Sequence, residues 1–347
     1  MAAGKSASLL DVARAAGVSL ATASRVLSGS GYPVSAETAR KVISAAERLE
    51  YQPNMLARNL KRQRSDVAGL VVRDMANPYF LEITRGVTER GNQLGLMIII
   101  CNTARDARVE LEYHEMLWEH QVGGIILAGG GRRGADFRNA LTRQAERFRT
   151  KGRPLVALAP QGIDLPGVMV DNRRLGRMLT EHLLGLGHAE VAFIGGPEDV
   201  VTSYERYLGY RDALRDAGIP ESPHLVRWES FIWDGGYRAA VSLVEAGARF
   251  TAVCVSNDSM ALGCLQALKE RGMRVPEDVS VAGMGNLPFA EYSSPALTTA
   301  AIPLYDMGAR AVDLVNQAMH GESLPERSVL LDPVLVERAS TGPSPGR

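Results

Sequence analysis

The sequence has few of the features that would place this chain in a membrane or in an oxidising compartment. It contains only three cysteines, Cys101, Cys254 and Cys264, and their odd number and apolar surroundings indicate reduced core residues. No apolar run approaches the length of a membrane span, and the first residues, MAAGKSASLL, lack the apolar core of a secretory signal. We therefore expect a cytoplasmic protein that has no membrane partner.

Motifs for catalysis and for cofactor binding are also missing. The glycine run Gly129–Gly131 has neither the spacing nor the following lysine of a phosphate-binding loop, and no G-x-S-x-G motif marks a nucleophilic serine. The six histidines show no metal-ligand spacing. We expect no enzyme activity, no cofactor and no metal, although an α/β enzyme remains an alternative because fold alone does not decide function.

The net charge of zero conceals an uneven distribution along the chain. Residues 1–65 contain ten basic and four acidic residues, a net charge of +6, and the rest of the chain carries −6. A basic end on a mildly acidic body favours contact with nucleic-acid phosphates, although such charges can also form an ordinary solvated surface. If phosphates are contacted, the affinity will fall steeply with salt.

The stretch SLLDVARAAGVSLATASRVLS, residues 8–28, predicts two short helices joined by a tight turn. Ser8 and Asp11 form a start that resembles a capping box, and apolar residues follow at helical spacing. Gly17 can take the left-handed conformation that ends the first helix, and Ser19 is placed to cap the second. This pattern is typical of a helix-turn-helix, whose second helix enters a DNA major groove; an ordinary helical hairpin is the alternative.

Two further segments extend this unit. Ser35 is placed to cap a third helix over residues 36–50, whose apolar face would close a small three-helix core. Pro53 then breaks the chain, and residues 54–61 form a short helix-capable piece with basic residues at its end. Because so short a helix is not stable alone in water, we expect this piece to be ordered only when something binds it.

From Asp66 onward, short apolar runs alternate with helical segments. This alternation is typical of parallel sheets covered on both faces, and it repeats before and after about Ile163, which predicts two similar α/β lobes. Ligands of such folds bind outside the carboxyl ends of the strands, here in the cleft between the lobes. The candidate strands are residues 67–72, 96–101, 123–128, 154–159, 167–170, 191–196, 252–256 and 279–284, and the candidate helices are residues 81–94, 110–121, 174–186, 204–217, 236–246 and 259–272.

The sequence as a whole resembles the lactose/galactose repressor family. The similarity begins with LLDVARAAGVSLATASRVLSG and VSAETARKVISAAERLEYQPNMLARNLK, and it continues through NPYFLEITRGV, LGHAEVAFIGG, SYERYLGYRDAL, SNDSMALG and VPEDVSVAG. It covers nearly the full length of the chain. The resemblance implies a small all-α helix-turn-helix headpiece plus an α/β two-lobed periplasmic-binding-protein-like core with parallel sheets.

The resemblance also implies how the chain is divided. The chain would cross between the lobes three times, near Ile163, near residues 289–294 and near Gly321. The C-terminal residues TGPSPGR contain no heptads, so we expect a homodimer without an added tetramer-forming helix. The expected divisions are a headpiece of residues 1–52, a hinge of residues 53–65, a first lobe of residues 66–163 and 292–321, and a second lobe of residues 164–291 and 322–340.

By the same resemblance, the second helix of the headpiece would read double-stranded operator DNA. Arg25 can donate two hydrogen bonds to a guanine, whereas Leu20 and Ala21 offer only apolar contact. Leu60 matches a hinge leucine that wedges into the minor groove, although it could also be a packing residue. The expected DNA-binding residues are Ser19, Leu20, Ala21, Thr22, Ser24, Arg25, Asn54, Leu60 and Lys61.

Other matched positions are expected to contact a small-molecule effector in the cleft. Arg206, in SYERYLGY, matches an arginine that binds ligand oxygens, and aromatic residues from both lobes match ring contacts. Plainer interpretations remain open, because rings at strand ends are often core and Asp258 could simply cap the helix that follows Asn257. The expected effector-binding residues are Tyr79, Phe80, Ser203, Arg206, Phe231, Asn257 and Asn286.

Departures from the family pattern bear on the effector. Gly285 and Ala159 stand where the family usually has acidic residues, whose carboxylates accept pairs of sugar hydroxyls. Losing both acids while Arg206 is kept removes negative charge from the cleft. This combination favours an anionic effector, and our hypothesis is a sugar acid such as gluconate; a neutral sugar or a purine is the alternative.

These observations together predict a ligand-responsive transcriptional regulator, acting as a repressor. A homodimer would place two headpieces on a pseudo-palindromic operator, and the effector would change DNA affinity through the hinge. Either direction of the effect remains open, since the effector could release DNA or be required for binding. A solute-binding receptor is the alternative that the body alone would support.

Overall fold

The computed structural model describes residues 7–28, 32–51, 65–325 and 327–346. The chain divides into two compact units, residues 1–65 and residues 66–347. Three of the expected DNA-binding residues, Asn54, Leu60 and Lys61, lie outside the described residues together with most of the expected hinge. No helix in the described ranges is both long enough and apolar enough to cross a bilayer.

Three short helices form the first unit: α1 (Leu9–Ala15), α2 (Leu20–Ser28) and α3 (Ala36–Arg48). The expected start of α1 is present, because Ser8 Oγ accepts a hydrogen bond from Asp11 N at 3.3 Å while Ser8 N donates to the Asp11 carboxylate at 2.9 Å. Val12, Ala23 and Val42, one residue from each helix, are fully buried. The apolar faces of the three helices therefore close a single small core.

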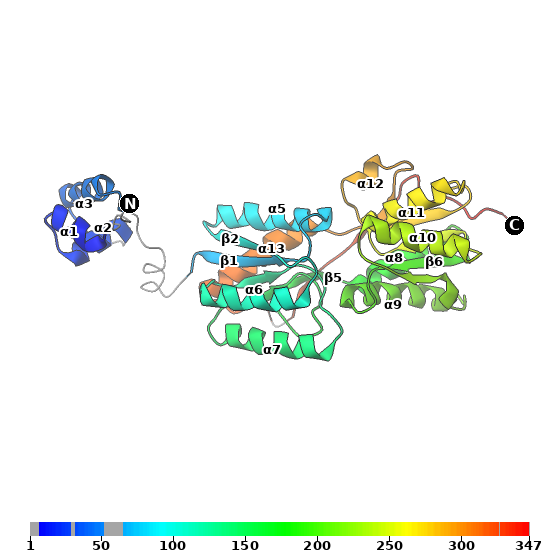
Figure 1. The fold of residues 1–347 in the computed structure, drawn as a ribbon, viewed down its shortest axis with the longest axis horizontal. Coiled ribbons are helices and arrows are strands. Elements are labelled where there is room, and N and C mark those ends of the chain that lie inside the picture. The colour runs from blue at the N-terminus through cyan, green and yellow to red at the C-terminus, as the bar shows by residue number, and fades with distance from the viewer. Residues whose placement is uncertain (1–6, 29–31, 52–64, 326, 347) are drawn as a thin grey trace, which may run out of the picture. The chain divides into compact units, whose positions relative to one another are not determined.

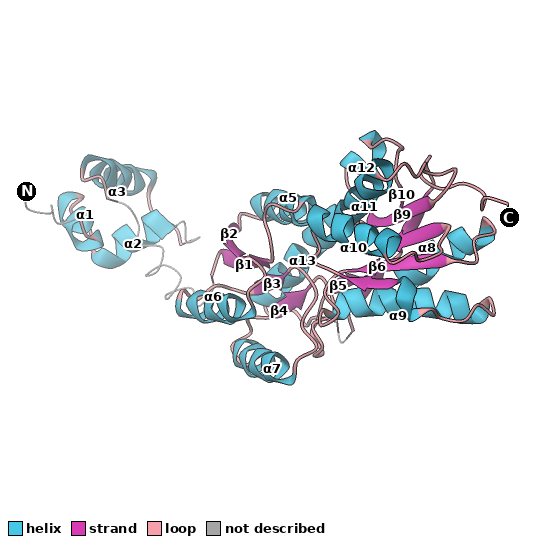
Figure 2. Ribbon diagram, turned by 45° about the vertical axis from the view of Figure 1, so that its right-hand side comes forward, coloured by secondary structure: helices cyan, strands magenta, loops and turns pink. Residues whose placement is uncertain are grey.

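The second unit consists of two lobes, and each is a sheet between helices (Figures 1 and 2). The sheet of the first lobe has the order β2-β1-β3-β4, and all of its strands are parallel. Helices α5 and α13 lie on one face of this sheet, and α6 and α7 lie on the other (Figure 1). The elements are β1 (Val67–Val72), α5 (Pro78–Gln93), β2 (Met97–Asn102), α6 (Ala107–Glu119), β3 (Ile125–Leu127), α7 (Ala135–Arg149), β4 (Leu155–Ala157) and α13 (Leu304–Met319).

The second lobe contains a larger sheet of the order β12-β10-β9-β8-β6-β7. Its strands are parallel except β12, which pairs antiparallel with β10. The pair α8 and α9 covers one face, and the pair α10 and α11 covers the other (Figure 1). The elements are α8 (Asn172–Gly185), β6 (Val191–Gly195), α9 (Val201–Asp216), β7 (Val226–Trp228), α10 (Trp233–Glu245), β8 (Ala252–Val255), α11 (Asp258–Glu270), β9 (Ser280–Gly285), α12 (Phe289–Tyr292), β10 (Thr298–Ala301) and β12 (Val334–Val336), with a 3₁₀ turn at Pro223–Leu225.

The chain crosses between the lobes later than the expected boundaries. The second crossing follows Ala301 and not residues 289–294, because the short helix α12 returns the chain to the same sheet and β10 pairs with β9. The first crossing follows β5 (Val168–Val170), since Gly167 still lies beside Ala157 of β4. The third follows β11 (Val329–Leu331), which pairs with β5, and so it falls well after Gly321.

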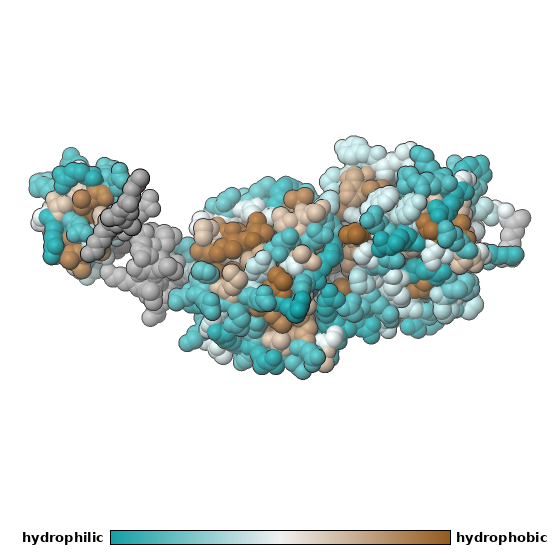
Figure 3. Space-filling view, in the orientation of Figure 1, coloured by the Kyte–Doolittle hydropathy of each residue, from teal (hydrophilic) through white to brown (hydrophobic). Residues whose placement is uncertain are grey.

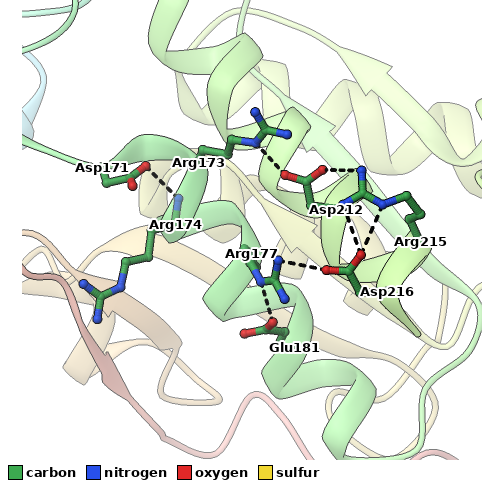
Figure 4. Close-up of polar contacts among 8 residues, drawn as sticks. All are labelled: Asp171, Arg173, Arg174, Arg177, Glu181, Asp212, Arg215 and Asp216. Carbon is green, nitrogen blue, oxygen red and sulfur yellow. Dashed lines mark hydrogen bonds and ion pairs between the residues drawn. The ribbon is translucent and has the colours of Figure 1, made fainter. Parts of the chain in front are cut away.

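Helices α8 and α9 pack closely, and this packing positions Arg206. A Cβ on Gly176 would lie 1.9 Å from the carbonyl oxygen of Arg206, and Gly209 approaches the backbone of α8 just as closely. Only glycine permits such an approach. On the outer side the same helices are joined by ion pairs, including Arg177 with Asp216 at 2.9 Å (Figure 4). This part of the second lobe therefore holds α9 at a fixed distance from α8.

Candidate ligand-binding cavity and nucleic-acid interface

The outer face of α2 carries the residues expected to contact DNA. Leu20, Ala21 and Arg25 are exposed, while Ala23 on the opposite side of the helix is fully buried. Ser24 lies half-buried beside them. The spacing of these residues follows from the helix period, because positions i, i+1, i+4 and i+5 share one face.

Two hydroxyl groups at the start of α2 are engaged with each other. Ser19 Oγ accepts a hydrogen bond from Thr22 N at 3.1 Å, which caps the helix, and the two side-chain oxygens lie 2.8 Å apart. Arg25 also has a neighbour, since its guanidinium carbon lies 4.5 Å from the centre of the exposed Tyr32 ring. The Arg25 guanidinium is therefore held over an aromatic face.

A small cavity lies between the two lobes of the second unit. Its volume is about 60 Å³, whereas pockets for small ligands usually measure at least roughly 300 Å³. A sugar-sized molecule can therefore enter only if the lobes part or the lining side chains move. The cavity is lined by Arg73, Asn77, Tyr79, Phe80, Arg105, Thr202, Arg206, Phe231, Asn257, Ser259, Met284 and Leu287.

The guanidinium of Arg206 forms the second-lobe wall of this cavity. Its side chain is 5% exposed, and its Nε donates to Asn172 Oδ1 at 2.9 Å while Nη1 donates to the carbonyl oxygen of Ser256. Both partners are neutral. Burial lowers the pKa of Arg206, and Tyr79 of the first lobe and Asp258 oppose that shift. Arg206 is thus a buried cation without a directly bonded carboxylate among the described residues.

Phe231 and Asn257 form a neighbouring part of the same wall. Asn257 Nδ2 donates to the carbonyl oxygen of Phe231 at 3.3 Å, and Asn257 Oδ1 caps α11 by accepting from Met260 N at 2.7 Å. The helix is therefore capped by Asn257, not by Asp258. The Phe231 ring lies against Gly196, where a Cβ would come within 2.2 Å of it. Both ends of the Asn257 amide are thus bonded to protein atoms.

Two of the expected effector-binding residues do not line the cavity. Ser203 is fully buried in α9, and its Oγ has no hydrogen-bond partner among the described residues. Asn286 is exposed with a φ of +55°, and its Oδ1 accepts from Arg338 Nη2 at 2.8 Å. The other five expected residues, Tyr79, Phe80, Arg206, Phe231 and Asn257, are brought together around the cavity.

The first-lobe wall contains two arginines that the sequence did not single out. Arg73 follows β1 and is 8% exposed; its Nη1 lies 3.0 Å from the Oε2 of the buried Glu110 on α6. Arg105 follows β2 and pairs with Asp74 at 3.1 Å. Burial lowers the pKa of Arg73, and Glu110 opposes that shift. The only available sequence signal was position, because each arginine follows a predicted strand.

Backbone contacts hold the two lobes together beside the cavity. Val201 N donates to the carbonyl oxygen of Gly131 at 2.9 Å, and Arg133 N donates to that of Asp199 at 2.7 Å. A Cβ on Gly130 would lie only 2.7 Å from the side chain of Thr202 on α9, so glycine permits the close approach of these segments. The glycine run therefore serves close packing between the lobes.

The described residues offer no metal centre. No group of three or more His, Cys, Asp or Glu side chains in the described ranges could hold a metal ion. The three cysteines are buried and free.

A helix-turn-helix unit joined to a two-lobed body with an interlobe cavity defines the class of ligand-responsive transcriptional regulators.

Comparison with known proteins identifies the family within this class. Residues 8–54 match the family model described as bacterial regulatory proteins, lacI family, and residues 180–341 match a periplasmic binding protein-like domain. The HTH-type transcriptional regulator DegA of Bacillus subtilis (strain 168) is 34% identical over 337 residues, which cover 96% of this chain and 98% of DegA. The chain therefore belongs to the lacI family and is a DNA-binding transcriptional regulator, not an enzyme.

Solved structures are similar over the same length. The lac repressor dimer bound to operator and the anti-inducer ONPF superposes with a TM-score of 0.85 at 27% identity, covering 97% of this chain and all of the other. The complex of the transcriptional regulator CelR with cellobiose gives a TM-score of 0.71 at 30% identity, covering 96% of this chain and 99% of the other. These similarities confirm the expected fold class.

Proposed function

We propose that this regulator is a cytoplasmic repressor that binds a pseudo-palindromic operator as a homodimer and responds to a small effector in the interlobe cavity. The observation that carries this proposal is that one chain contains both an exposed α2 face and a cavity lined from both lobes. The lac repressor, similar over nearly the whole chain, is described as a dimer on its operator. Ligand binding that changes how the lobes close would change DNA affinity by the difference between the two states.

An exposed apolar surface on the first lobe supports the homodimer. Met97 and Ile100 on the edge strand β2 are 60% and 41% exposed, and Leu81 of α5 and Met116 of α6 are about half exposed. Figure 3 shows a brown area over the β2 region. Because monomeric proteins rarely leave such side chains together in water, and because an edge strand is prone to pairing, a second copy of this chain is the fitting partner.

The charge of the cavity supports an acidic effector, for which a sugar acid such as gluconate is our hypothesis. Arg73, Arg105 and Arg206 line the cavity, and no carboxylate does so among the described residues. Gly285 and Ala159 are buried near the strand ends and supply no acid that could accept sugar hydroxyls. An acidic effector would add a charged partner to the Arg206 guanidinium, whose hydrogen bonds to Asn172 and Ser256 are to neutral groups.

The DNA-reading role is tested most simply at Arg25. We expect Arg25→Gln to lower the affinity for the operator roughly tenfold to a hundredfold, the effect of losing a two-bond contact to guanine, and to relax selectivity at one base position. The measurement is fluorescence anisotropy with the operator fragment and a scrambled fragment. Arg40→Gln on α3 is the control for lost charge, and equal losses in the two variants would show that Arg25 acts only as a general cation.

A further inference from the structure

Arg73 differs from the other cavity-lining side chains because its hydrogen bonding is incomplete. The residue is 8% exposed, and its Nε is buried without a hydrogen-bond partner among the described residues. Native proteins bond nearly all of their buried polar atoms, and the donors of a charged group are the most costly to leave unbonded. The Nε–H of Arg73 can therefore donate a hydrogen bond to a ligand atom.

The surroundings of Arg73 hold the guanidinium in place from two sides. Gly129 has a φ of +108°, and a Cβ there would come within 2.9 Å of Arg73 Cδ and Nε, so the missing side chain leaves the space in which the arginine lies. Glu110 anchors Nη1 at 3.0 Å from the side of α6 and does not itself line the cavity. The side chain is therefore oriented before any ligand arrives.

The charge around Arg73 favours an anion over a neutral group. Arg105 and Arg132 lie near enough to act on the Arg73 charge, and so do the carboxylates of Glu110 and Asp199. Neither of these carboxylates lines the cavity, and nor does Asp74, the partner of Arg105. Across the cavity, Arg206 has only neutral bonding partners. Cations therefore face the cavity from both lobes.

We propose that Arg73 is a specificity-determining residue that binds an oxyanion of the effector from the first lobe, while Arg206 binds the same effector from the second. The oxyanion is a carboxylate or a phosphate, since the planar guanidinium fits both with paired hydrogen bonds. The effector is then an acidic sugar derivative held between the lobes. This inference rests on the proposed function of the cavity as the effector site.

A purely structural role for Arg73 makes a different prediction. If the ion pair with Glu110 only braces α6 against β1, then removing either partner will weaken the lobe and lower every ligand affinity alike. If Arg73 binds the oxyanion, the negative charge of Glu110 repels that oxyanion and weakens its binding. Removing the Glu110 charge will then strengthen anion binding, while removing Arg73 will weaken it.

The experiment is isothermal titration calorimetry on the full-length protein with three probes: D-gluconate, D-glucose 6-phosphate and D-glucose. We expect the wild type to bind at least one of the two acids more tightly than glucose. Arg73→Met should lower the affinity for that acid about tenfold to a hundredfold, the usual effect of losing a charged hydrogen-bond partner, and should lower the affinity for glucose much less. Glu110→Gln, which keeps the size and one acceptor oxygen, should raise the affinity for the acid.

Arg108→Gln is the matched control, because Arg108 lies on α6 with its side chain 87% exposed and does not line the cavity. Equal losses of acid and glucose affinity in the Arg73 and Glu110 variants would overturn the proposal. The proposal would also be overturned if the wild-type protein bound neither of the two acids. Operator binding by the same preparation separates these results from a failure of the regulator function. The preferred acid identifies the oxyanion as carboxylate or phosphate.

Discussion

Asp258 is a buried carboxylate directly behind the cavity wall. Its two oxygens accept hydrogen bonds from Thr299 Oγ1 at 2.6 Å and from Leu287 N at 2.8 Å, and Leu287 lines the cavity. Burial raises the pKa of Asp258 from its ordinary 3.8 to about 6, despite these hydrogen bonds. At a pH between these two values, the folded protein therefore holds a proton at this site that the unfolded chain has already released.

The raised pKa of Asp258 makes stability depend on pH in a predictable direction. Between about pH 4 and pH 6 the folded state binds more protons than the unfolded state, so the free energy of unfolding falls as pH rises through this window. The loss is on the order of 3 kcal/mol and is complete above the folded pKa. We predict that Asp258→Asn removes this part of the slope.

Urea unfolding at pH 4, 5, 6 and 7 measures the effect. The comparison is between the slopes of the wild type and the variant, because the amide that replaces the carboxylate has only one acceptor oxygen and the absolute stability of the variant can differ. Parallel curves for the two proteins between pH 4 and pH 6 would show that Asp258 titrates normally.

At the residue scale, the sequence predicted the roles of side chains whose partners are close along the chain. It missed the roles of side chains whose partners are distant in the sequence. The capping box of Ser8 and Asp11 depends on residues three positions apart, and it forms as expected. Arg73 was not singled out from the sequence, because its buried position depends on a pairing with Glu110 of a separate helix. Asn286 follows a strand too, but its backbone turns the side chain toward Arg338 and away from the cavity.

At the scale of elements, the edge strand β2 allows a direct test of dimerisation. Ile100 and Met97 are exposed on this strand. We predict that the double variant Met97→Asp, Ile100→Asp sediments as a monomer at concentrations where the wild type is a dimer, because charges on both positions would be buried at the interface without partners. Sedimentation velocity over a concentration series measures this shift.

Val334→Asp is the control for that experiment. Val334 is 62% exposed on β12, the edge strand of the other sheet. A wild type that is monomeric at every concentration, or a dimer that survives the β2 charges, would contradict the assignment of this edge to the homodimer interface.

The sequence predicted continuous apolar strands more readily than polar helices. Strand β1 occupies residues 67–72 as expected, because its run VAGLVV is apolar throughout. Helix α7 was missed, since its sequence ADFRNALTRQAERFR has few apolar residues and buries only Phe137, Leu141 and Phe148. Helix α13 packs on α5 of the first lobe, although it follows strand β10 of the second lobe. No local sequence pattern predicts that the chain crosses between the lobes at this point.

At the scale of the whole molecule, the second unit is closed around a cavity of about 60 Å³. Backbone hydrogen bonds between Gly131 and Val201 and between Arg133 and Asp199 hold the lobes together. A ligand that fits only a more open or differently closed arrangement must break or rearrange these contacts. We expect its binding energy to shift the balance between arrangements and to change DNA affinity by linkage.

Effector-controlled operator binding is the central claim, and fluorescence anisotropy tests it most directly. The full-length protein is titrated into labelled fragments from upstream of its own gene, at several salt concentrations, with and without sugars, sugar acids and purines. We predict that one fragment is bound selectively, that its affinity falls steeply with salt, and that at least one acidic compound changes that affinity. If no fragment is bound selectively under any condition while a compound still binds the two-lobed unit, the protein acts as a solute receptor and the claim is contradicted.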